Sequence, residues 1–579
     1  MAKNKIGYFT FVLHAHLPYV LSHGKWPHGM DWLNEAAAET YLPILTALNE
    51  LREEGIAPKM SIGITPVLTE QLADESFKTE FESYLHQKIQ AAIDDQITFK
   101  KYGNLHLHEL AVMWEKFYRK TLSDFVGIYH YDLVGAFREL SDAGYLDLIT
   151  CGATHGYFPL LGLDTSIQAQ VKTAVKTHIR HYGKPPRGIW LPEAAYRPRY
   201  EWVPPVESAL GKKPYLRKGV DEFLSENGIE YFFVDSALLR GGKAIGVYID
   251  RFEALKKLWA QFEKQITVRE EDTEKSPYEI YLVSSNPELK KPVAIFTRDP
   301  KTGLQVWSGE WGYPGDSWYL DFHKKHFPGG HRYWRVTSPK SDLADKEEYS
   351  AENADRRIPE NADHFVHLIK DTLREHHAAT GRIGALVAPF DAELFGHWWF
   401  EGPRFLKAVL ERLANDDEVQ LANTAEILDN KKPVEVISIP EGSWGEGGYH
   451  YIWLNEDTSW TWSHIYNAEK RMTDILSKLD WKNNPELQNI LKQAARELLL
   501  LQASDWQFLI STWSARDYAE MRFEEHVREF NRIVDIAEIY AHSGTLSDAD
   551  RIYVNDSKKR DFLFPDLELK WWQNLEYPV

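Results

Sequence analysis

The chain contains, between residues 188 and 198, the stretch Gly188-Ile-Trp-Leu-Pro-Glu-Ala-Ala-Tyr-Arg-Pro198, a short apolar run that ends at a carboxylate. A second stretch, Pro389-Phe-Asp-Ala-Glu-Leu-Phe-Gly-His-Trp-Trp399, repeats this arrangement with Asp391 and Glu393. Short apolar runs of this kind are typical of buried strands in a parallel sheet. Acids at two strand ends among tryptophans indicate sugar chemistry, because carboxyl pairs cleave glycosidic bonds and sugar rings stack on indoles.

Up to about residue 425, short apolar runs alternate with longer helical stretches, which is the pattern of parallel βα units. The candidate strands are 6–14, 59–64, 147–151, 188–191, 231–234, 292–297, 383–389 and 419–422. Seven or eight such units predict a closed barrel in preference to an open sheet. Barrel enzymes place their chemistry at the C-terminal ends of the strands. The predicted strand ends carry His14, Glu193, Asp235, Asp299 and Asp391.

Two segments interrupt the alternation. Residues 77–140 are mostly helical and too long for one crossover, so they predict a helical insertion that leans over the barrel mouth. Residues 241–289 are charged and only patchily apolar, which predicts a surface excursion or a mobile lid. Beyond about residue 460 the strand pattern stops, and helical periodicity follows at 463–479, 486–503 and 516–542. We therefore expect a catalytic barrel over residues 1–430 and a helical domain over residues 431–579.

Composition limits the partners and the compartment. The 579 residues include 67 lysines plus arginines and 86 acids, and the net charge of −19 disfavours nucleic acid or an anionic membrane as a partner. The single cysteine, Cys151, excludes an internal disulfide and a thiolate zinc cluster. No apolar run is long enough to cross a bilayer, and His14, His16 and Pro18 interrupt the N-terminal run too early for a signal peptide. These features predict a cytoplasmic protein with a neutral ligand.

Glu193 and Asp391 come from different predicted strands, which allows their carboxyl groups to face each other across one substrate. One carboxylate of such a pair attacks the anomeric carbon, and the other protonates the leaving oxygen and later activates the acceptor. The ionised nucleophile raises the pKa of its neighbour, which keeps the second acid protonated near neutral pH. Alternatively, the carboxylates could be structural partners of Arg197 or His397, and Glu393 competes with Asp391 for the acid role.

Histidines and tryptophans are the other candidate site residues. His14 and His16 lie on one face of a strand, because side chains alternate with period two. With His155, this spacing fits either a metal site or a cradle of neutral imidazoles for sugar hydroxyls, and each histidine could also be a core residue. The tryptophans number 21, and several lie in glycine-rich segments that could present flat rings to a glucan or pack between domains.

Together, these segments resemble glycoside hydrolase family 57, and within it the α-1,4-glucan branching enzymes. The resemblance spans nearly the whole length, in family order, through His14-Ala-His-Leu-Pro-Tyr19, Ala153-Thr-His-Gly-Tyr157, the stretch 188–198, Phe390-Asp-Ala-Glu-Leu-Phe-Gly-His-Trp398 and Leu421-Ala-Asn-Thr-Ala-Glu-Ile427. It implies an α/β fold, a distorted (β/α)7 barrel of the TIM type with an α-helical C-terminal domain. It also implies no metal or other cofactor, and a retaining double displacement on α-glucans such as amylose and glycogen.

The resemblance also implies roles for individual residues. Glu193 is expected to be the nucleophile and Asp391 the general acid/base. His14, His16 and His155 are expected to line the subsite that receives the cleaved sugar. The remaining residues expected at the glucan groove are Arg298, Trp307, Trp444, Trp453 and Asp505. Because Asp505 lies in a further family-like signature, Gln502-Ala-Ser-Asp-Trp506, the helical domain is expected to contribute to the site.

Two departures from the family pattern bear on the reaction. Ala194 stands where the branching enzymes usually carry a cysteine, and we expect no effect on the mechanism. The loop tyrosine that shields the covalent intermediate has three candidates, Tyr248, Tyr278 and Tyr281, because the segment 241–289 is longer and more charged than expected. If that loop does not close, water competes with the acceptor sugar and hydrolysis replaces transfer.

The resulting hypothesis is a glycogen-branching activity that cleaves an α-1,4 linkage, holds the released chain on Glu193 and transfers it to a 6-hydroxyl. An α-amylase or a 4-α-glucanotransferase on the same site would form no new α-1,6 linkages. A metal-dependent polysaccharide deacetylase would contain stoichiometric zinc, and a catalytically silent glucan-binding protein would be indifferent to Glu193→Gln.

Overall fold

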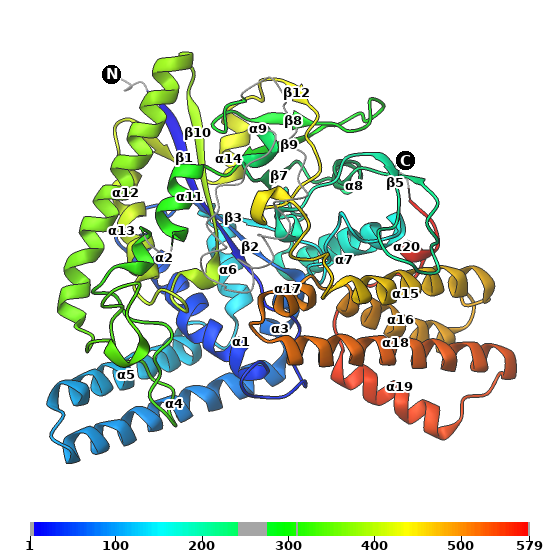
Figure 1. Cartoon of the computed structure of the whole chain (residues 1–579), viewed down its shortest axis with the longest axis horizontal. Coiled ribbons are helices and arrows are strands. Elements are labelled where there is room, and N and C mark those ends of the chain that lie inside the picture. Colours follow the sequence, from blue (N-terminus) through cyan, green and yellow to red (C-terminus); the bar gives the residue numbers. More distant parts are fainter. Residues whose placement is uncertain (1–4, 241–274, 309–310, 577–579) are drawn as a thin grey trace.

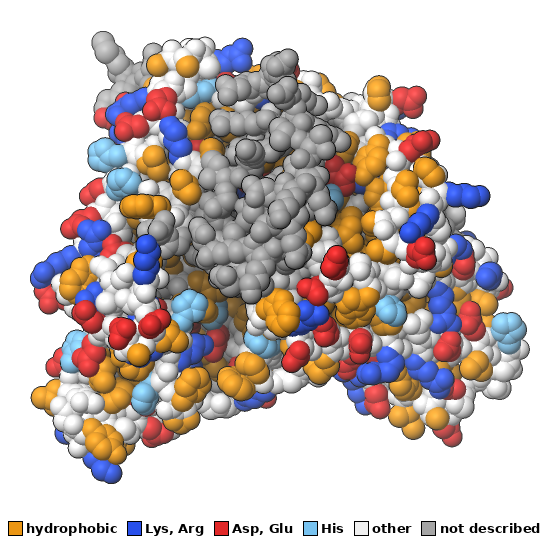
Figure 2. Space-filling model, viewed as in Figure 1, with side chains coloured by type: hydrophobic (Ala, Val, Ile, Leu, Met, Phe, Trp, Pro, Cys, Tyr) orange, Lys and Arg blue, Asp and Glu red, His pale blue; other side chains and the backbone are white. Residues whose placement is uncertain are grey.

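The structure, a computed structural model, describes residues 5–240, 275–308 and 311–576. A barrel of parallel strands lies at the centre, helices surround it, and a group of C-terminal helices packs against one side (Figure 1). Acidic and basic side chains are intermixed over this C-terminal group on the face shown in Figure 2. Every helix in the described ranges is too short or too polar to pass through a lipid bilayer.

The barrel contains seven of the described strands, and they close into a ring. Their bounds are β1 (Gly7–Ala15), β2 (Met60–Ile64), β3 (Leu146–Ile149), β4 (Gly188–Ile189), β7 (Tyr231–Val234), β9 (Val293–Thr297) and β10 (Gly384–Asp391). Parallel ladders give the orders β10-β1-β2-β3 and β9-β7-β4. Single parallel bridges join Thr150 to Ile189 and Arg298 to Val387, and so connect the two ladders. Closure through single bridges in place of full ladders makes the barrel distorted, and the predicted (β/α)7 architecture is confirmed.

The remaining strands lie outside the ring. The predicted strand near residue 420 is β11 (Val419–Leu421), which pairs with the first residues of β1. A hairpin consists of β5 (Tyr200–Trp202) and β6 (Tyr215–Arg217). At the edge of β9 lie β8 (Tyr281–Val283) and then β12 (Val436–Ile437). The predicted lid 241–289 is therefore described only from residue 275, where it contributes the buried strand β8, and Tyr248 lies outside the described residues.

Helices connect the strands and cover the outside of the barrel. Those before β9 are α1 (Met30–Ala36), the π-helix η1 (Ala37–Tyr41), α2 (Leu42–Glu53), α3 (Pro66–Ala73), α4 (Glu75–Lys101), α5 (Leu105–Ser123), η2 (Asp124–Ile128), α6 (Leu133–Asp142), α7 (Asp164–Tyr182), α8 (Val220–Glu226) and α9 (Ala237–Arg240). Those after β9 are α11 (Pro300–Trp307), α12 (Ala351–Thr380), α13 (Gly402–Ala414) and α14 (Thr424–Asn430). The long pair α4 and α5 lies in the segment for which a helical insertion was predicted, and it projects from one corner (Figure 1).

Local sequence signals define the ends of several of these helices. Asp74 at the start of α4 and Ser350 at the start of α12 accept backbone N–H groups of the first turn. At the other end, α7 and α12 stop at Gly183 and Gly381, whose φ values of 75° and 69° favour glycine. These caps fix where each chain segment turns back toward the barrel.

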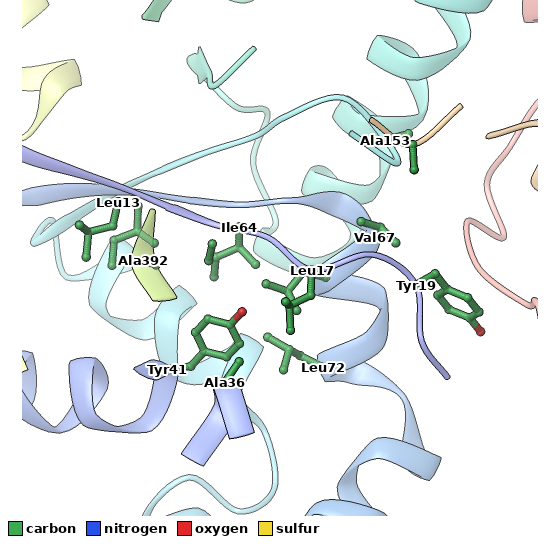
Figure 3. Packing of buried hydrophobic residues seen from close by; sticks show 14 of the residues in the cluster. Leu13, Leu17, Tyr19, Ala36, Tyr41, Ile64, Val67, Leu72, Ala153 and Ala392 are labelled. Carbon is green, nitrogen blue, oxygen red and sulfur yellow. The ribbon is translucent and has the colours of Figure 1, made fainter. Parts of the chain in front are cut away.

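Two buried clusters follow from the alternation of side chains along β1. Phe9, Phe11 and Leu13 belong to the large cluster formed with the surrounding helices. Figure 3 shows Leu13 near Ile64 of β2 and Ala392 after β10. Val12 points the other way, into a second cluster inside the ring, with Ile149, Trp190, Phe233, Phe296 and Val387. Since His14 has the same parity as Val12, its imidazole is directed into the barrel.

The C-terminal helices are α15 (Ser459–Lys478), α16 (Pro485–Leu501), α17 (Asp505–Thr512), α18 (Arg516–Ser543), α19 (Asp548–Arg560) and α20 (Lys570–Gln573). The helical path is interrupted between α16 and α17, where Ala503 forms an antiparallel bridge with Gly156 of the segment after β3. Gln502 donates to the buried Glu469 of α15. This break brings the first residues of α17 to the C-terminal ends of the barrel strands.

Candidate active site

The two predicted catalytic acids lie on opposite sides of the barrel mouth. Asp391, the last residue of β10, is the register partner of His14 on β1. Glu193 follows β4, which is separated from β10 by two strands in one direction around the ring and by three in the other. A substrate entering the mouth therefore passes between strand ends that carry one acid each.

The backbone at Glu193 is in a left-handed conformation. It lies in the short turn η3 (Pro192–Ala194) with φ 58° and ψ 25°, and the next residue, Ala194, also has a positive φ of 46°. His155, after β3, has φ 61°. Non-glycine residues in this region cost about 1 kcal/mol or more each, and such strain is concentrated at functional sites. The turn directs the Glu193 side chain into the mouth, where tertiary contacts hold it.

Both carboxylate oxygens of Glu193 accept a hydrogen bond. Trp444 donates its indole Nε1–H to Oε2 at 2.9 Å, and Ser504 donates its hydroxyl to Oε1 at 3.2 Å. The side chain is only 13% exposed, and burial raises the pKa of Glu193 to about 7. The bond from Trp444 opposes this rise, because it favours the charged form. Glu193 is thus a carboxyl group that changes charge near neutral pH.

His14 and His155 form a neutral pair beside Glu193. Their Nε2 atoms are 3.0 Å apart, and His155 Nδ1 lies 2.8 Å from Ser504 Oγ and 3.8 Å from Glu193 Oε1. Burial, and the proximity of His16, lower the pKa values of both imidazoles well below the ordinary range. Each ring therefore carries a single proton near neutral pH, and its position is determined by the hydrogen bonds.

His16 differs from these two because a carboxylate faces it. Its Nε2 lies 2.9 Å from Oδ1 and 3.0 Å from Oδ2 of Asp505, and its Nδ1 lies 3.0 Å from Thr65 Oγ1. Burial is the largest single effect and lowers the pKa of His16, but Asp505, Glu393 and Glu193 together outweigh it, and the net shift is upward. The ring stacks on His155 with centroids 3.9 Å apart. An ion pair therefore links the barrel to the first residue of α17.

Glu393 has a structural role in this conformation. It accepts a hydrogen bond from the Tyr41 hydroxyl at 2.6 Å and another from the backbone N–H of His16 at 3.1 Å, and burial raises its pKa. Tyr41 ends the π-helix η1, so these contacts tie the irregular helix to the strand end. Of the two acids in this segment, Asp391 is partly exposed and Glu393 is buried, which favours Asp391 for the acid role.

The alternative structural partners bind elsewhere. Arg197 donates to the backbone oxygen of Lys218 at 2.9 Å, and His397 Nδ1 lies 3.0 Å from Glu39 Oε2. Two other predicted strand-end acids are also engaged. Asp299 caps α11 and accepts the Tyr278 hydroxyl at 2.8 Å. Asp235 lies 3.5 Å from Nε of Arg298, the residue that bridges β9 to β10.

The predicted glucan-binding tryptophans differ in their surroundings. Trp444 donates its N–H to Glu193, and its ring packs edge-on against Trp190 with centroids 5.0 Å apart. Trp453, 1% exposed, stacks on Tyr157 at 4.5 Å. Trp307 ends a helix, is 3% exposed and lies 6.2 Å from the Phe390 ring. The rings of Trp307 and Trp453 are therefore packed and not presented on open loops, and their roles toward a glucan stay predictions.

Sequence reasoning did not identify Ser504, Tyr41 or Thr65. Ser504 precedes α17, where a serine ordinarily indicates only a helix cap. Its neighbour Asp505 was expected at the groove, and it does lie beside His16. Of the candidate shielding tyrosines, Tyr278 donates to Asp299 and Tyr281 donates to the backbone oxygen of Ser276 within its own segment.

Two groups at the site have the spacing of metal ligands. The ligand atoms of His14, Cys151 and His155, and those of His16, His155 and Asp505, lie within 4.8 Å of one another. The ring nitrogens that face each other are already hydrogen-bonded, and burial raises the pKa of the Cys151 thiol well above its ordinary value. A cation would have to displace these contacts, so the arrangement fits a polar cradle better than a preformed metal centre.

Comparison with protein families assigns both parts of the chain. Residues 10–440 match the family model described as glycosyl hydrolase family 57, and residues 464–572 match the model described as 1,4-alpha-glucan branching enzyme, C-terminal. A curated 1,4-alpha-glucan branching enzyme of Thermococcus kodakarensis is 44% identical over 532 residues, which cover 91% of this chain and 73% of that protein.

Solved structures agree with this assignment. The crystal structure of the branching enzyme from the same archaeon superposes with a TM-score of 0.88 at 41% identity, covering 99% of this chain and 98% of that one. A branching enzyme from Pyrococcus horikoshii gives 0.87 at 39% identity, with the same coverage of 99% and 98%. An alpha-amylase from Thermotoga maritima gives 0.79 at 29% identity, covering 98% of this chain and 99% of the amylase. The chain belongs to glycosyl hydrolase family 57.

Proposed function

We propose that this protein is a 1,4-α-glucan branching enzyme, which cleaves an α-1,4 linkage and transfers the released chain to a 6-hydroxyl to form an α-1,6 branch. The observation that carries the proposal is that Glu193 and Asp391 follow or end two different strands on opposite sides of one barrel mouth. The match of residues 464–572 to a branching-enzyme C-terminal model supports it, because that segment supplies Ser504 and Asp505 to the site.

In the first step, Asp391 protonates the glycosidic oxygen while a Glu193 oxygen attacks the anomeric carbon. The carbon–oxygen bond of the linkage breaks, the reducing-side fragment leaves with a free 4-hydroxyl, and the donor chain is held as an ester on Glu193. In the second step, Asp391 removes the proton from a 6-hydroxyl of another glucan, and that oxygen displaces Glu193 from the anomeric carbon. The two inversions retain the α-configuration.

The surrounding side chains suit the recognition of a sugar next to Glu193. Neutral His14 and His155 can each donate or accept a hydrogen bond, and the His16–Asp505 pair places a donor and an acceptor side by side. In this proposal these residues bind hydroxyls of the sugar that becomes the ester. In this proposal Arg298, Trp307, Trp444 and Trp453 line the groove, and Trp444 does so at Glu193 itself.

The alternative on the same site is hydrolysis, as in an α-amylase, or transfer to a 4-hydroxyl. An amylase relative with a TM-score of 0.79 favours keeping this alternative in the test. The two outcomes differ in the second step alone, because water or a 4-hydroxyl would take the place of the 6-hydroxyl. Exclusion of water from the ester therefore determines the product.

Incubation of the purified protein with amylose tests the proposal. We expect new α-1,6 linkages in the NMR spectrum of the product, with few new reducing ends, and loss of both signals in Glu193→Ala and Asp391→Ala. Reducing ends without α-1,6 linkages would assign the protein to hydrolysis. Activity that survives in both variants would remove the acid pair from the mechanism.

We extend the proposal to the setting of the reaction. The substrates are α-glucans such as amylose and glycogen, and the reaction is a step of glycogen biosynthesis. The single cysteine supports a location in the cytoplasm. In this proposal, residues 1–430 form the catalytic domain and residues 431–579 the helical domain. The second domain is part of the active site, because Trp444, Ser504 and Asp505 all contact residues of the first.

A further inference from the structure

Ser504 occupies a helix cap position but uses its hydroxyl for another contact. It is the N-cap of α17, and its side chain makes no capping hydrogen bond to that helix. The hydroxyl donates to Glu193 Oε1 and lies 2.8 Å from His155 Nδ1, while the Ser504 backbone N–H donates to the His155 carbonyl at 3.0 Å. Ser504 is completely buried. A side chain of the helical domain thus reaches the carboxylate expected to attack the substrate.

The hydrogen bonds that lead to Glu193 through Ser504 all run in one direction, from donor to acceptor. The ionised Glu193 can only accept, so the single Ser504 proton points at it, and Ser504 Oγ must accept the Nδ1–H of His155. The neutral His155 then has a bare Nε2, which accepts the Nε2–H of His14. The chain ends at His14 Nδ1, a buried nitrogen without a hydrogen-bond partner among the described residues. Every proton in the sequence His14, His155, Ser504 points toward Glu193.

We propose that Ser504 is a positioning residue whose hydroxyl orients Glu193 and stabilises its ionised form. The hydroxyl accepts a hydrogen bond from His155, which accepts one from His14, so these barrel histidines act on Glu193 through a residue of the helical domain. This inference deepens the proposed function and rests on Glu193 as the nucleophile. Trp444 holds the other oxygen, so the two donors together fix the rotation of the carboxylate plane. Removal of the serine hydroxyl frees that rotation and leaves Oε1 without its donor.

The charge of Glu193 also depends on the other groups that face it. The titratable groups around it are His16, Cys151, His155, Tyr157 and Asp505. Of these, Asp505 disfavours the ionised carboxylate and His16 favours it. The two lie in an ion pair with each other, and neither contacts Ser504 through a side-chain hydrogen bond within the described residues. A change at Ser504 therefore leaves their opposing effects in place.

The test compares two buried serines of the same helical segment. Ser504→Ala removes the donor to Glu193, whereas Ser511→Ala removes a hydroxyl of α17 that donates to the backbone oxygen of Ile452. For both variants and the wild type, kcat/KM for amylose cleavage is measured from pH 5 to pH 9, with circular dichroism and thermal unfolding to confirm folding. Ser504→Thr keeps a hydroxyl and serves as the conservative rescue.

We expect the acid limb of the Ser504→Ala profile to move up by about one pH unit or more, because a hydrogen bond to a charged group favours ionisation by at least that amount. Its deficit of about tenfold or more at pH 6 then shrinks toward pH 9. The limb of Ser511→Ala is expected to coincide with that of the wild type, and Ser504→Thr to return toward it. The pH at which the limb falls reports the pKa of the Glu193 carboxyl, even if only part of the variant protein is active.

A Ser504→Ala limb that coincides with the wild type, at whatever activity, overturns the inference, because a purely structural serine lowers the amplitude alone. Glu193→Gln separates this failure from a failure of the proposed function. If that variant is inactive while the Ser504→Ala limb is unmoved, Glu193 keeps its role and Ser504 loses its own. If Glu193→Gln remains active, the proposed function itself fails.

Discussion

Replacement of Glu193 by glutamine is expected to stabilise the folded protein at pH 8 while abolishing glucan transfer. Glutamine has the shape of the carboxyl group and no charge, and its amide oxygen can still accept the Trp444 N–H at the barrel mouth. In the wild type, burial raises the pKa of Glu193 from 4.5 to about 7, so the ionised form is less favourable in the folded protein than in the unfolded chain. The glutamine variant removes that penalty.

The size of the effect follows from the shift in pKa. Because the folded pKa lies above the unfolded value, the protein has its full stability below pH 4.5 and loses part of it as the pH rises through 7. At 1.36 kcal/mol per pKa unit, the loss approaches about 3 kcal/mol at pH 8 and stays below about 1 kcal/mol at pH 5. For a chain of 579 residues, this corresponds to a rise in Tm of about 2 to 3 °C at pH 8.

Differential scanning calorimetry at pH 5 and pH 8 measures this difference. Glu393→Gln is the matched control, because it also replaces one buried carboxyl group by an amide. Its hydrogen bonds differ from those of Glu193, since Glu393 accepts a tyrosine hydroxyl and a backbone N–H. A Tm difference between Glu193→Gln and the wild type that is the same at both pH values would refute the reasoning. A glutamine variant that is less stable than the wild type at pH 8 would also do so.

Two further changes probe the contacts that surround the acid pair. Asp505→Asn is expected to lower Tm more at pH 6 than at pH 9. The pKa of His16 is raised, so its ion pair with Asp505 stabilises the protein where His16 is charged, and this stability is lost as the pH rises. A loss of Tm that does not depend on pH would contradict the ion pair. Tyr41→Phe is expected to lower the free energy of unfolding by about 1 to 3 kcal/mol, since it leaves the buried Glu393 without its hydroxyl donor. Urea unfolding measures that loss, with Tyr131→Phe as the control at a partly exposed hydroxyl, and equal stability of the two variants would show that the Tyr41 contact is dispensable.

The barrel could be predicted because its strands carry local signals. Buried parallel strands are apolar on both faces, and most of those here are separated by helical segments, so their order along the chain is visible without tertiary information. The manner of closure was not visible. Two single bridges, at Ile189 and at Arg298, join ladders that are distant in sequence, and the strand near residue 420 pairs beside β1 without entering the ring.

Glu193 and Asp391 could be predicted as the catalytic pair because their positions at strand ends are a property of the local sequence. The hydrogen bonds that hold Glu193 connect it to Trp444 and Ser504, which lie hundreds of positions away in the chain. Glu393 resembles Asp391 in sequence, yet its carboxyl is held by Tyr41 and by the backbone of His16. Periodicity along the chain contains no information about such pairings, because it describes which face a side chain occupies and not what lies opposite.

The sequence by itself determined the fold class and the family resemblance and predicted the two acids, since these follow from short apolar runs and from motifs that are contiguous in the chain. Only the tertiary structure decided that Trp444 and Ser504 hold the two oxygens of Glu193, that His16 pairs with Asp505, and that Trp307 and Trp453 are packed. The physical reason is burial. The pKa of a carboxyl group and the direction of a proton depend on which donors and charges surround it in space, and the fold alone brings them together.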